Sequence, residues 1–298
     1  MALKFGIAGI ALSLSLVAYR PAIAATSPAP DFKTFTNWCL NREKISPAAK
    51  HTVEALLERV RETDCKQADS QLVKQIGINL IGKNLSDLRP LQSLTNLEIL
   101  SLDDNEIEDL KPLQSLINLS DLTLDNNQII DISPLKTLTK LEFLTLRRNL
   151  INDIKPLQTL ILLKTLSLQQ NRVSDISPLK FLTNLSMLDL SHNQISDLRP
   201  LQPLVNLGLL ALQKNKVRDL TPLKSLHELG ILNLGYNQVS DLLPLQALLK
   251  LVVLNLVQNQ ISDLRPLRSL PKLDIVALQG NPIANKICPL PLPATCQF

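Results

Sequence analysis

The hydrophobic positions of the chain recur with a constant period over most of its length, so that Leu100, Leu122 and Leu144 are equivalent. In the unit LTNLEILSLDDNEIEDLKPLQS, Leu100 and Leu102 alternate with Ser101, which predicts a short strand with one buried face. Pro112 follows later in the same unit. Because proline lacks an N–H group and cannot lie within a central strand, we expect it in a turn or short 3₁₀ segment on the opposite side of the unit.

Each unit is expected to close one turn of a solenoid, because its leucines become buried only when a neighbouring turn covers them. The composition agrees with this interpretation: 67 of the 298 residues are leucine, and only 3% are aromatic. A core of this kind must be filled almost entirely by leucine. We expect about ten turns, the first of which is atypical because Lys83 replaces the asparagine that the others carry.

An asparagine column and an aspartate column run through the repeats. The asparagines are Asn105, Asn127, Asn149, Asn171, Asn193, Asn215, Asn237, Asn259 and Asn281. An amide side chain both donates and accepts, so this column is expected to satisfy buried backbone groups of its own turn and the next. The aspartates, from Asp87 to Asp263, are expected to accept N–H bonds at the start of the following segment. The alternative, a ladder of calcium ligands, needs several oxygens around each ion, and one carboxylate per turn does not supply them.

The turn pattern LxxLxLxxNxIxDLxPLxxLxN resembles the leucine-rich repeats of bacterial internalins over about residues 75–284. The resemblance implies the α/β class: a right-handed leucine-rich repeat solenoid with a curved parallel β-sheet on the concave face and short 3₁₀ or turn segments on the convex face. It also implies a binding function, because members of the internalin family bind host surface receptors. The repeat domain is therefore assigned to residues 75–284.

The two ends of the chain predict an exported protein with capped repeats. Residues 1–24 have a basic start, an uncharged stretch and an Ala22-Ile23-Ala24 cleavage site, which is typical of a secretory signal peptide. Residues 25–74 are expected to form a linker and a helical N-terminal cap, with a helix starting at Ser46-Pro47 and with Trp38 packed inside. Residues 285–298 would close the last turn. After cleavage, no membrane span is expected.

Four cysteines occur as two close pairs, Cys39 with Cys65 and Cys288 with Cys296. In an exported protein these are expected to form two disulfides. A zinc site is the alternative, but neither pair has the spacing of a zinc knuckle. Secretion or a periplasmic location follows from the signal peptide and these pairs together.

The strand residues that point away from the core are free to vary, and one such column is the candidate contact surface. It contains Ile99, Asp121, Phe143, Thr165, Met187, Leu209, Ile231, Val253 and Ile275. From Met187 onward the column is wholly apolar. Exposed apolar side chains in a row are costly unless a partner covers them. Shielding by neighbouring side chains, or a role in stiffening the sheet, is the alternative.

Charge also changes along this surface. It is acidic near its N-terminal end, at Glu98, Asp103, Asp104, Asp121 and Asp125, and becomes basic at Arg147, Arg148 and Lys164. Such a step can orient a partner, although charged loops beside strands also serve solubility. Phe143, Arg147, Arg148 and Tyr236 are residue types that dominate binding interfaces, so they join the candidate site.

The sequence offers little for catalysis. His51, His192 and His227 are separated by the repeat register, and bridged cysteines cannot act as nucleophiles. Basic residues alternate with aspartates, and no glycine-rich phosphate loop is present, so nucleic acid, cofactors and metals are not expected. We therefore expect a non-catalytic protein that binds a protein partner outside the cytoplasm. A structural component of the cell envelope, or a regulatory scaffold similar to phosphatase-regulating repeat proteins, is the alternative.

Overall fold

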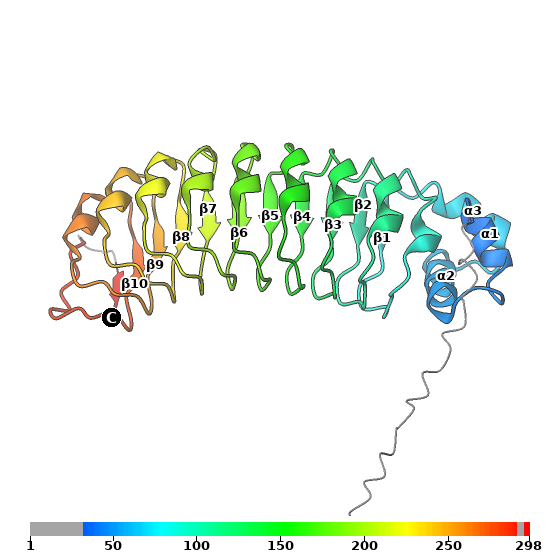
Figure 1. Ribbon diagram of the computed structural model, residues 1–298, viewed down its shortest axis with the longest axis horizontal. Helices are drawn as coiled ribbons and strands as arrows, with labels where there is room; N and C mark the ends of the chain where they lie inside the picture. The colour runs from blue at the N-terminus through cyan, green and yellow to red at the C-terminus, as the bar shows by residue number, and fades with distance from the viewer. Residues whose placement is uncertain (1–31, 291–294) are drawn as a thin grey trace, which may run out of the picture. The chain divides into compact units, whose positions relative to one another are not determined.

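Each repeat unit contributes one strand of three residues. Within the described residues of the computed structural model, 32–290 and 295–298, these strands form a single parallel sheet in sequence order (Figure 1). The middle residue of a strand, such as Leu100, points into the core, and Leu102 just beyond the strand is buried with it. The strands are β1 Gly77–Asn79, β2 Ile99–Ser101, β3 Asp121–Thr123, β4 Phe143–Thr145, β5 Thr165–Ser167, β6 Met187–Asp189, β7 Leu209–Ala211, β8 Ile231–Asn233, β9 Val253–Asn255, β10 Ile275–Ala277 and β11 Thr295–Gln297.

The core is a stack of leucine layers, one from each turn. From β1 to β10 every strand pairs with the equivalent residues of the next turn, as in Leu100 with Leu122. The same column of leucines is therefore covered on both sides by its own copies. Full burial of a leucine side chain stabilises a protein by about 1.5–3 kcal/mol, and here that gain exists only when the adjacent turn is present.

A short 3₁₀ helix with proline as its second residue lies on the side of the stack opposite the sheet, as predicted (Figure 1). The 3₁₀ segments are Arg89–Leu91, Lys111–Ser115, Ser133–Thr137, Lys155–Thr159, Ser177–Phe181, Arg199–Leu201, Thr221–Ser225, Leu243–Ala247 and Arg265–Ser269. The column aspartate two residues earlier accepts the first N–H group, as in Asp109 Oδ1 to Lys111 N at 2.9 Å. This contact caps the turn in the way that an N-cap residue caps a helix.

The asparagine column lies buried where the chain leaves each strand. Asn193 Oδ1 accepts the Val173 N–H at 2.9 Å, and its Nδ2 donates to Leu168 O at 2.8 Å and Leu190 O at 3.1 Å. The equivalent bonds recur at all nine asparagines. They join each turn to the preceding one, whereas the sequence pattern predicted bonds to the next turn. The direction follows from the bend of the chain, which brings the amide beside the turn already completed.

Three helices cover the first turn: α1 Phe35–Leu40, α2 Pro47–Val60 and α3 Cys65–Leu72. The predicted start of α2 is confirmed, because Ser46 Oγ accepts the Ala49 N–H at 3.2 Å. Trp38 is fully buried among these helices, and its Nε1 donates to Phe32 O at 3.0 Å. A disulfide between Cys39 and Cys65 joins α1 to α3. The predicted signal peptide, residues 1–24, lies outside the described residues.

The C-terminal end adds one strand more than the ten turns predicted. β11 pairs in parallel with β10 at a shorter interval along the chain than the repeat period, and Cys296 takes the place of the buried leucine opposite Val276. A disulfide links Cys296 to Cys288. The final edge of the repeats is therefore paired along the whole of β10. The shortened interval and the missing leucine explain why the repeat pattern did not indicate this strand.

Replacement of Asn193 by alanine tests the role of the asparagine column. The change leaves the Val173 N–H without a partner inside the stack, while Leu168 O and Leu190 O each lose one donor and keep a bond from Asn171 or Asn215, so we expect it to lower the free energy of unfolding by about 2 kcal/mol. Urea unfolding followed by circular dichroism measures the loss.

Asn206→Ala is the matched control. Asn206 is exposed and makes a single bond, from Nδ2 to Thr183 O at 2.9 Å, so we expect a loss of about 1 kcal/mol or less. Equal losses for the two variants would contradict the assignment.

Candidate partner-binding face

The strand face is formed by the side chains that point away from the core on β2–β10, together with those of the loop residues just before and after each strand. The first residue of each strand lies on it. Strand register places Met187, Leu209, Ile231, Val253 and Ile275 opposite one another on five consecutive strands. Neighbouring strands are about 4.8 Å apart, so the side chains form a continuous row, here called the apolar row.

The apolar row is open to solvent at three of its positions. Met187 is 46% exposed, Ile231 42% and Ile275 40%. Leu209 and Val253 between them are half-buried. Shielding by neighbours, the alternative in the sequence analysis, thus applies to these two side chains and not to the row as a whole.

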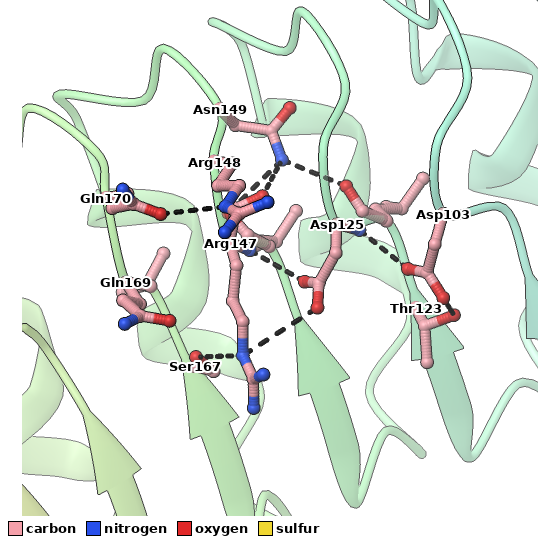
Figure 2. A network of polar contacts seen from close by, with 12 residues as sticks. Asp103, Thr123, Asp125, Arg147, Arg148, Asn149, Ser167, Gln169 and Gln170 are labelled. Carbon is pink, nitrogen blue, oxygen red and sulfur yellow. Dashed lines mark hydrogen bonds and ion pairs between the residues drawn. The ribbon is translucent and has the colours of Figure 1, made fainter.

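Two of the three residues in the predicted basic segment, Arg147 and Lys164, are paired with acidic side chains of the protein itself. Arg147 Nε lies 3.0 Å from Ser167 Oγ and 3.7 Å from Asp125 Oδ2 (Figure 2). Arg148 Nε donates to Gln170 Oε1 at 2.8 Å, and Lys164 forms an ion pair with Glu142. The change from acidic to basic along the strand face is therefore weaker than the sequence indicates. Arg147 and Arg148 follow β4, the strand that begins with the half-buried Phe143.

The acidic end of the strand face forms a ladder of its own. Asp103 Oδ2 accepts from Thr123 Oγ1 and Asp103 Oδ1 from the Asp125 N–H, both at 2.7 Å, and Asp125 Oδ1 accepts the Arg147 N–H at 2.7 Å (Figure 2). Burial raises the pKa of the Asp125 carboxyl above its usual value, and the negative charge of Asp103 adds to the increase. Hydrogen bonds from the Arg147 N–H and from Thr145 oppose this rise in the pKa.

Tyr236 lies on the strand face but apart from Phe143. It is 46% exposed just after β8, and Lys214 Nζ lies 5.5 Å from the centre of its ring. Four strand steps of about 4.8 Å separate β4 from β8, so the two aromatic side chains do not share one contact point. Tyr236 has a left-handed backbone, with φ of 58°, as have Arg148 and His192 at the equivalent positions.

Phe181 was missed in the sequence analysis because it occupies a position where most other turns carry serine or threonine. It is 48% exposed on the 3₁₀ side, with Lys180 Nζ 5.0 Å from its ring centre. Together with Pro178 and Lys155 it lines a depression of about 520 Å³. Similar polar depressions recur between other turns on that side, so this one follows from the repeat geometry.

The described residues, 32–290 and 295–298, contain no group of three or more histidine, cysteine or acidic side chains that could hold a metal ion. His192 is half-buried after β6, and burial lowers the pKa of its imidazole. His51 lies in α2, where its Nε2 is 2.6 Å from Lys83 O. Over the same part of the chain, no helix is long and apolar enough to cross a membrane.

Stacked turns with one parallel strand each, a buried leucine column and a continuous asparagine ladder define a leucine-rich repeat protein. The leucine-rich repeat family, in its two-copy form, matches residues 161–203. Internalin C2 of Listeria monocytogenes is 32% identical over 76% of this chain and 91% of its own, with a TM-score of 0.61. The chain belongs to the internalin-like leucine-rich repeat proteins.

Other solved structures share the fold. An internalin (inlF) of Listeria monocytogenes is 28% identical, covers 87% of both chains and has a TM-score of 0.56. The ectodomain of the receptor kinase GASSHO1/SCHENGEN3 of Arabidopsis thaliana, solved in complex with Casparian strip integrity factor 2, is 27% identical with a TM-score of 0.61. That match covers 69% of this chain and 27% of the receptor chain. No curated protein sequence matches significantly. Leucine-rich repeats are protein-interaction modules, which use the broad surface that stacked turns present.

The carboxyl of Asp125 gives a pH-dependent prediction. Folding raises its pKa, so the stability that this group contributes is complete below the usual aspartate pKa of about 3.9 and is lost as the pH rises through the raised value. Asp125→Asn removes the titrating group and keeps an oxygen for the Arg147 N–H. We expect the variant to be more stable than the wild type at pH 7 and indistinguishable from it at pH 3, as measured by urea midpoints.

Asp197→Asn is a control with the opposite sign. A hydrogen bond from the Arg199 side chain lowers the pKa of Asp197, so its contribution is present above the usual aspartate pKa and lost as the pH falls through the lowered value. This variant should be less stable than the wild type at pH 7, and the difference should shrink in acid. Shifts of the same sign for both variants would contradict the interpretation.

Proposed function

We propose that this protein is an exported, non-enzymatic module that binds a protein partner through its strand face. The observation that carries the proposal is the apolar row, which exposes Met187, Ile231 and Ile275 on one surface of a rigid sheet. Nothing in the repeat requires apolar residues at these positions, because the equivalent residues Asp121 and Thr165 are polar. Continuous apolar surface of this kind is typical of protein contacts.

Export is supported by the cysteines. Both pairs form disulfides, one between helices of the N-terminal cap and one at the final strand. Disulfides persist in oxidising compartments and are rare in the cytosol. They favour the exported protein over a cytosolic scaffold similar to phosphatase-regulating repeat proteins. The expected signal peptide, residues 1–24, belongs to the same proposal.

A protein or peptide partner is supported by the relatives. The Arabidopsis receptor ectodomain, 27% identical to this chain, was solved in complex with Casparian strip integrity factor 2. The plant peptide hormone receptor RGFR1, solved in complex with RGF2, is 18% identical with a TM-score of 0.63, so it supports the fold alone. A purely structural envelope role would need no apolar row on the strand face.

The double variant Leu209→Glu/Ile231→Glu tests this function. Two carboxylates in the middle of the apolar row would have to be desolvated on binding, so we expect partner affinity to fall at least tenfold. The thermal midpoint should change much less, since Ile231 is exposed and Leu209 is only half-buried. Immobilised residues 25–298 would be used to capture the partner, and the captured protein would then be titrated against wild type and variant.

Val205→Glu/Leu249→Glu is the matched control. These side chains are 48% and 55% exposed, but each follows a 3₁₀ segment and lies off the strand face. They should leave affinity unchanged. Binding that survives Leu209→Glu/Ile231→Glu, or that is lost equally in the control, would exclude the apolar row as the contact surface.

A further inference from the structure

Two glycines lie side by side on the strand face. Gly208 and Gly230 immediately precede β7 and β8, and the Gly230 N–H donates to Gly208 O at 2.8 Å. Every other turn from Ile76 to Asp274 carries a side chain at this position, and the whole chain has only 8 glycines. We call Gly208 and Gly230 the glycine pair.

The fold does not require glycine at either position. Neither residue has a left-handed backbone, and an added Cβ would meet its nearest atoms, Ser186 O and Gly208 O, at an ordinary 3.7 Å. Glycine in a strand costs about 0.5–1 kcal/mol relative to alanine. Apart from each glycine itself and its two chain neighbours, no atom of the described residues comes closer than 3.7 Å to either Cβ position, so the missing side chains are best explained by a partner that approaches the backbone closely.

The residues around the glycine pair favour contact with an apolar side chain of a partner. Leu209 and Ile231 follow it on the apolar row, and Met187 and Val252, 46% and 39% exposed, flank it. The backbone has no free group to offer: the Gly208 N–H donates to Ser186 O at 2.9 Å, and Gly208 O accepts from Gly230 and Ile231. A flat aromatic ring can lie on two adjacent glycines and contact the apolar side chains beside them without needing a hydrogen bond.

The acidic residues near the N-terminal end of the strand face indicate the chemistry of a second part of the partner. Among the described residues, Glu98, Asp103, Asp104 and Asp121 form no ion pair with a cation, whereas Arg147 and Lys164 on the neighbouring strands are paired. The acidic end therefore attracts a positively charged group. From β3 to β7 or β8 there are four or five strand steps, about 19–24 Å. An extended chain covers that distance in about six or seven residues.

We propose that the strand face binds an extended protein segment in which an aromatic side chain rests on the glycine pair and a lysine or arginine, six or seven residues away, pairs with the acidic end. This inference rests on the proposed function, because it names the chemistry of a partner of the same face. The inference adds two features that would determine specificity. One is the glycine pair, where side chains are absent, and the other is the acidic end, where carboxylates have no ion-pair partner.

A random peptide library displayed on phage, with inserts long enough to hold both side chains, is the probe. Selection on the immobilised full-length chain should enrich peptides that carry an aromatic residue and a basic residue at the stated separation. Synthetic copies of the enriched peptides should bind Gly208→Val/Gly230→Val at least tenfold more weakly than the wild type. Asp103→Asn/Asp121→Asn should weaken the same peptides severalfold and reduce the salt dependence of binding.

Gly77→Val is the matched control, because Gly77 starts β1 and an added Cβ would also make only ordinary contacts there, the nearest at 3.6 Å. It should bind the peptides like the wild type. If the valine pair lowers the thermal midpoint, Gly208→Ala/Gly230→Ala replaces it, with a smaller expected loss of affinity.

The outcomes separate this inference from the proposed function. Peptides that lose binding in Leu209→Glu/Ile231→Glu but bind the glycine variants undiminished would overturn the inference and leave the function intact. Basic peptides without an aromatic residue, sensitive only to the aspartate changes, would also overturn it. If no enriched peptide responds to any strand-face variant, both the inference and the function are wrong.

Discussion

The structure depends on the burial of leucines between adjacent turns. A single turn has one buried face and no interior of its own, so its apolar side chains leave water only when the neighbouring turns are in place. Close stacking would leave backbone N–H and C=O groups without hydrogen-bond partners at the point where the chain leaves each strand. The asparagine column resolves this, because each amide bonds its own turn and the preceding one. Leucine burial and amide bonding thus require the same spacing, and this is why the repeat period is kept so strictly from Asn105 to Asn281.

With the inner positions committed to stacking, only the outward positions can differ between turns. The strand face shows this freedom: the same position holds Asp121 on β3, Phe143 on β4 and Ile231 on β8. The acidic ladder, the two arginines after β4 and the apolar row therefore follow one another on a sheet whose strand register does not change from β1 to β10. A partner that covers several strands therefore contacts side chains of different charge and polarity on successive strands, which lie about 4.8 Å apart. The two ends of the stack are closed by different means, three helices at one end and a disulfide-bonded strand at the other.

Much of the fold could be predicted from the sequence because its main interactions recur. Nine copies of one asparagine, nine copies of one proline and two cysteine pairs are clear signals whatever the residues between them. Predictions were wrong or incomplete where the pattern breaks. β11 was missed since Cys296 follows Val276 at a shorter interval than the repeat period and replaces a leucine. The glycine pair was missed as well, although its signal was visible: two glycines at the same position of successive turns.

The sequence by itself determined the period, the buried columns, the side of each turn on which proline lies and the apolar character of the row from Met187 onward. These follow from the properties of single residues repeated at equal intervals. Only the tertiary structure decided which outward side chains are accessible and which charges are free. Leu209 is half-buried and Ile231 exposed, Arg147 is held by Asp125 and Ser167, and Arg148 adopts a left-handed backbone. The burial and the pairing depend on side chains of the neighbouring turns that lie against these residues in space, and no local pattern specifies those contacts.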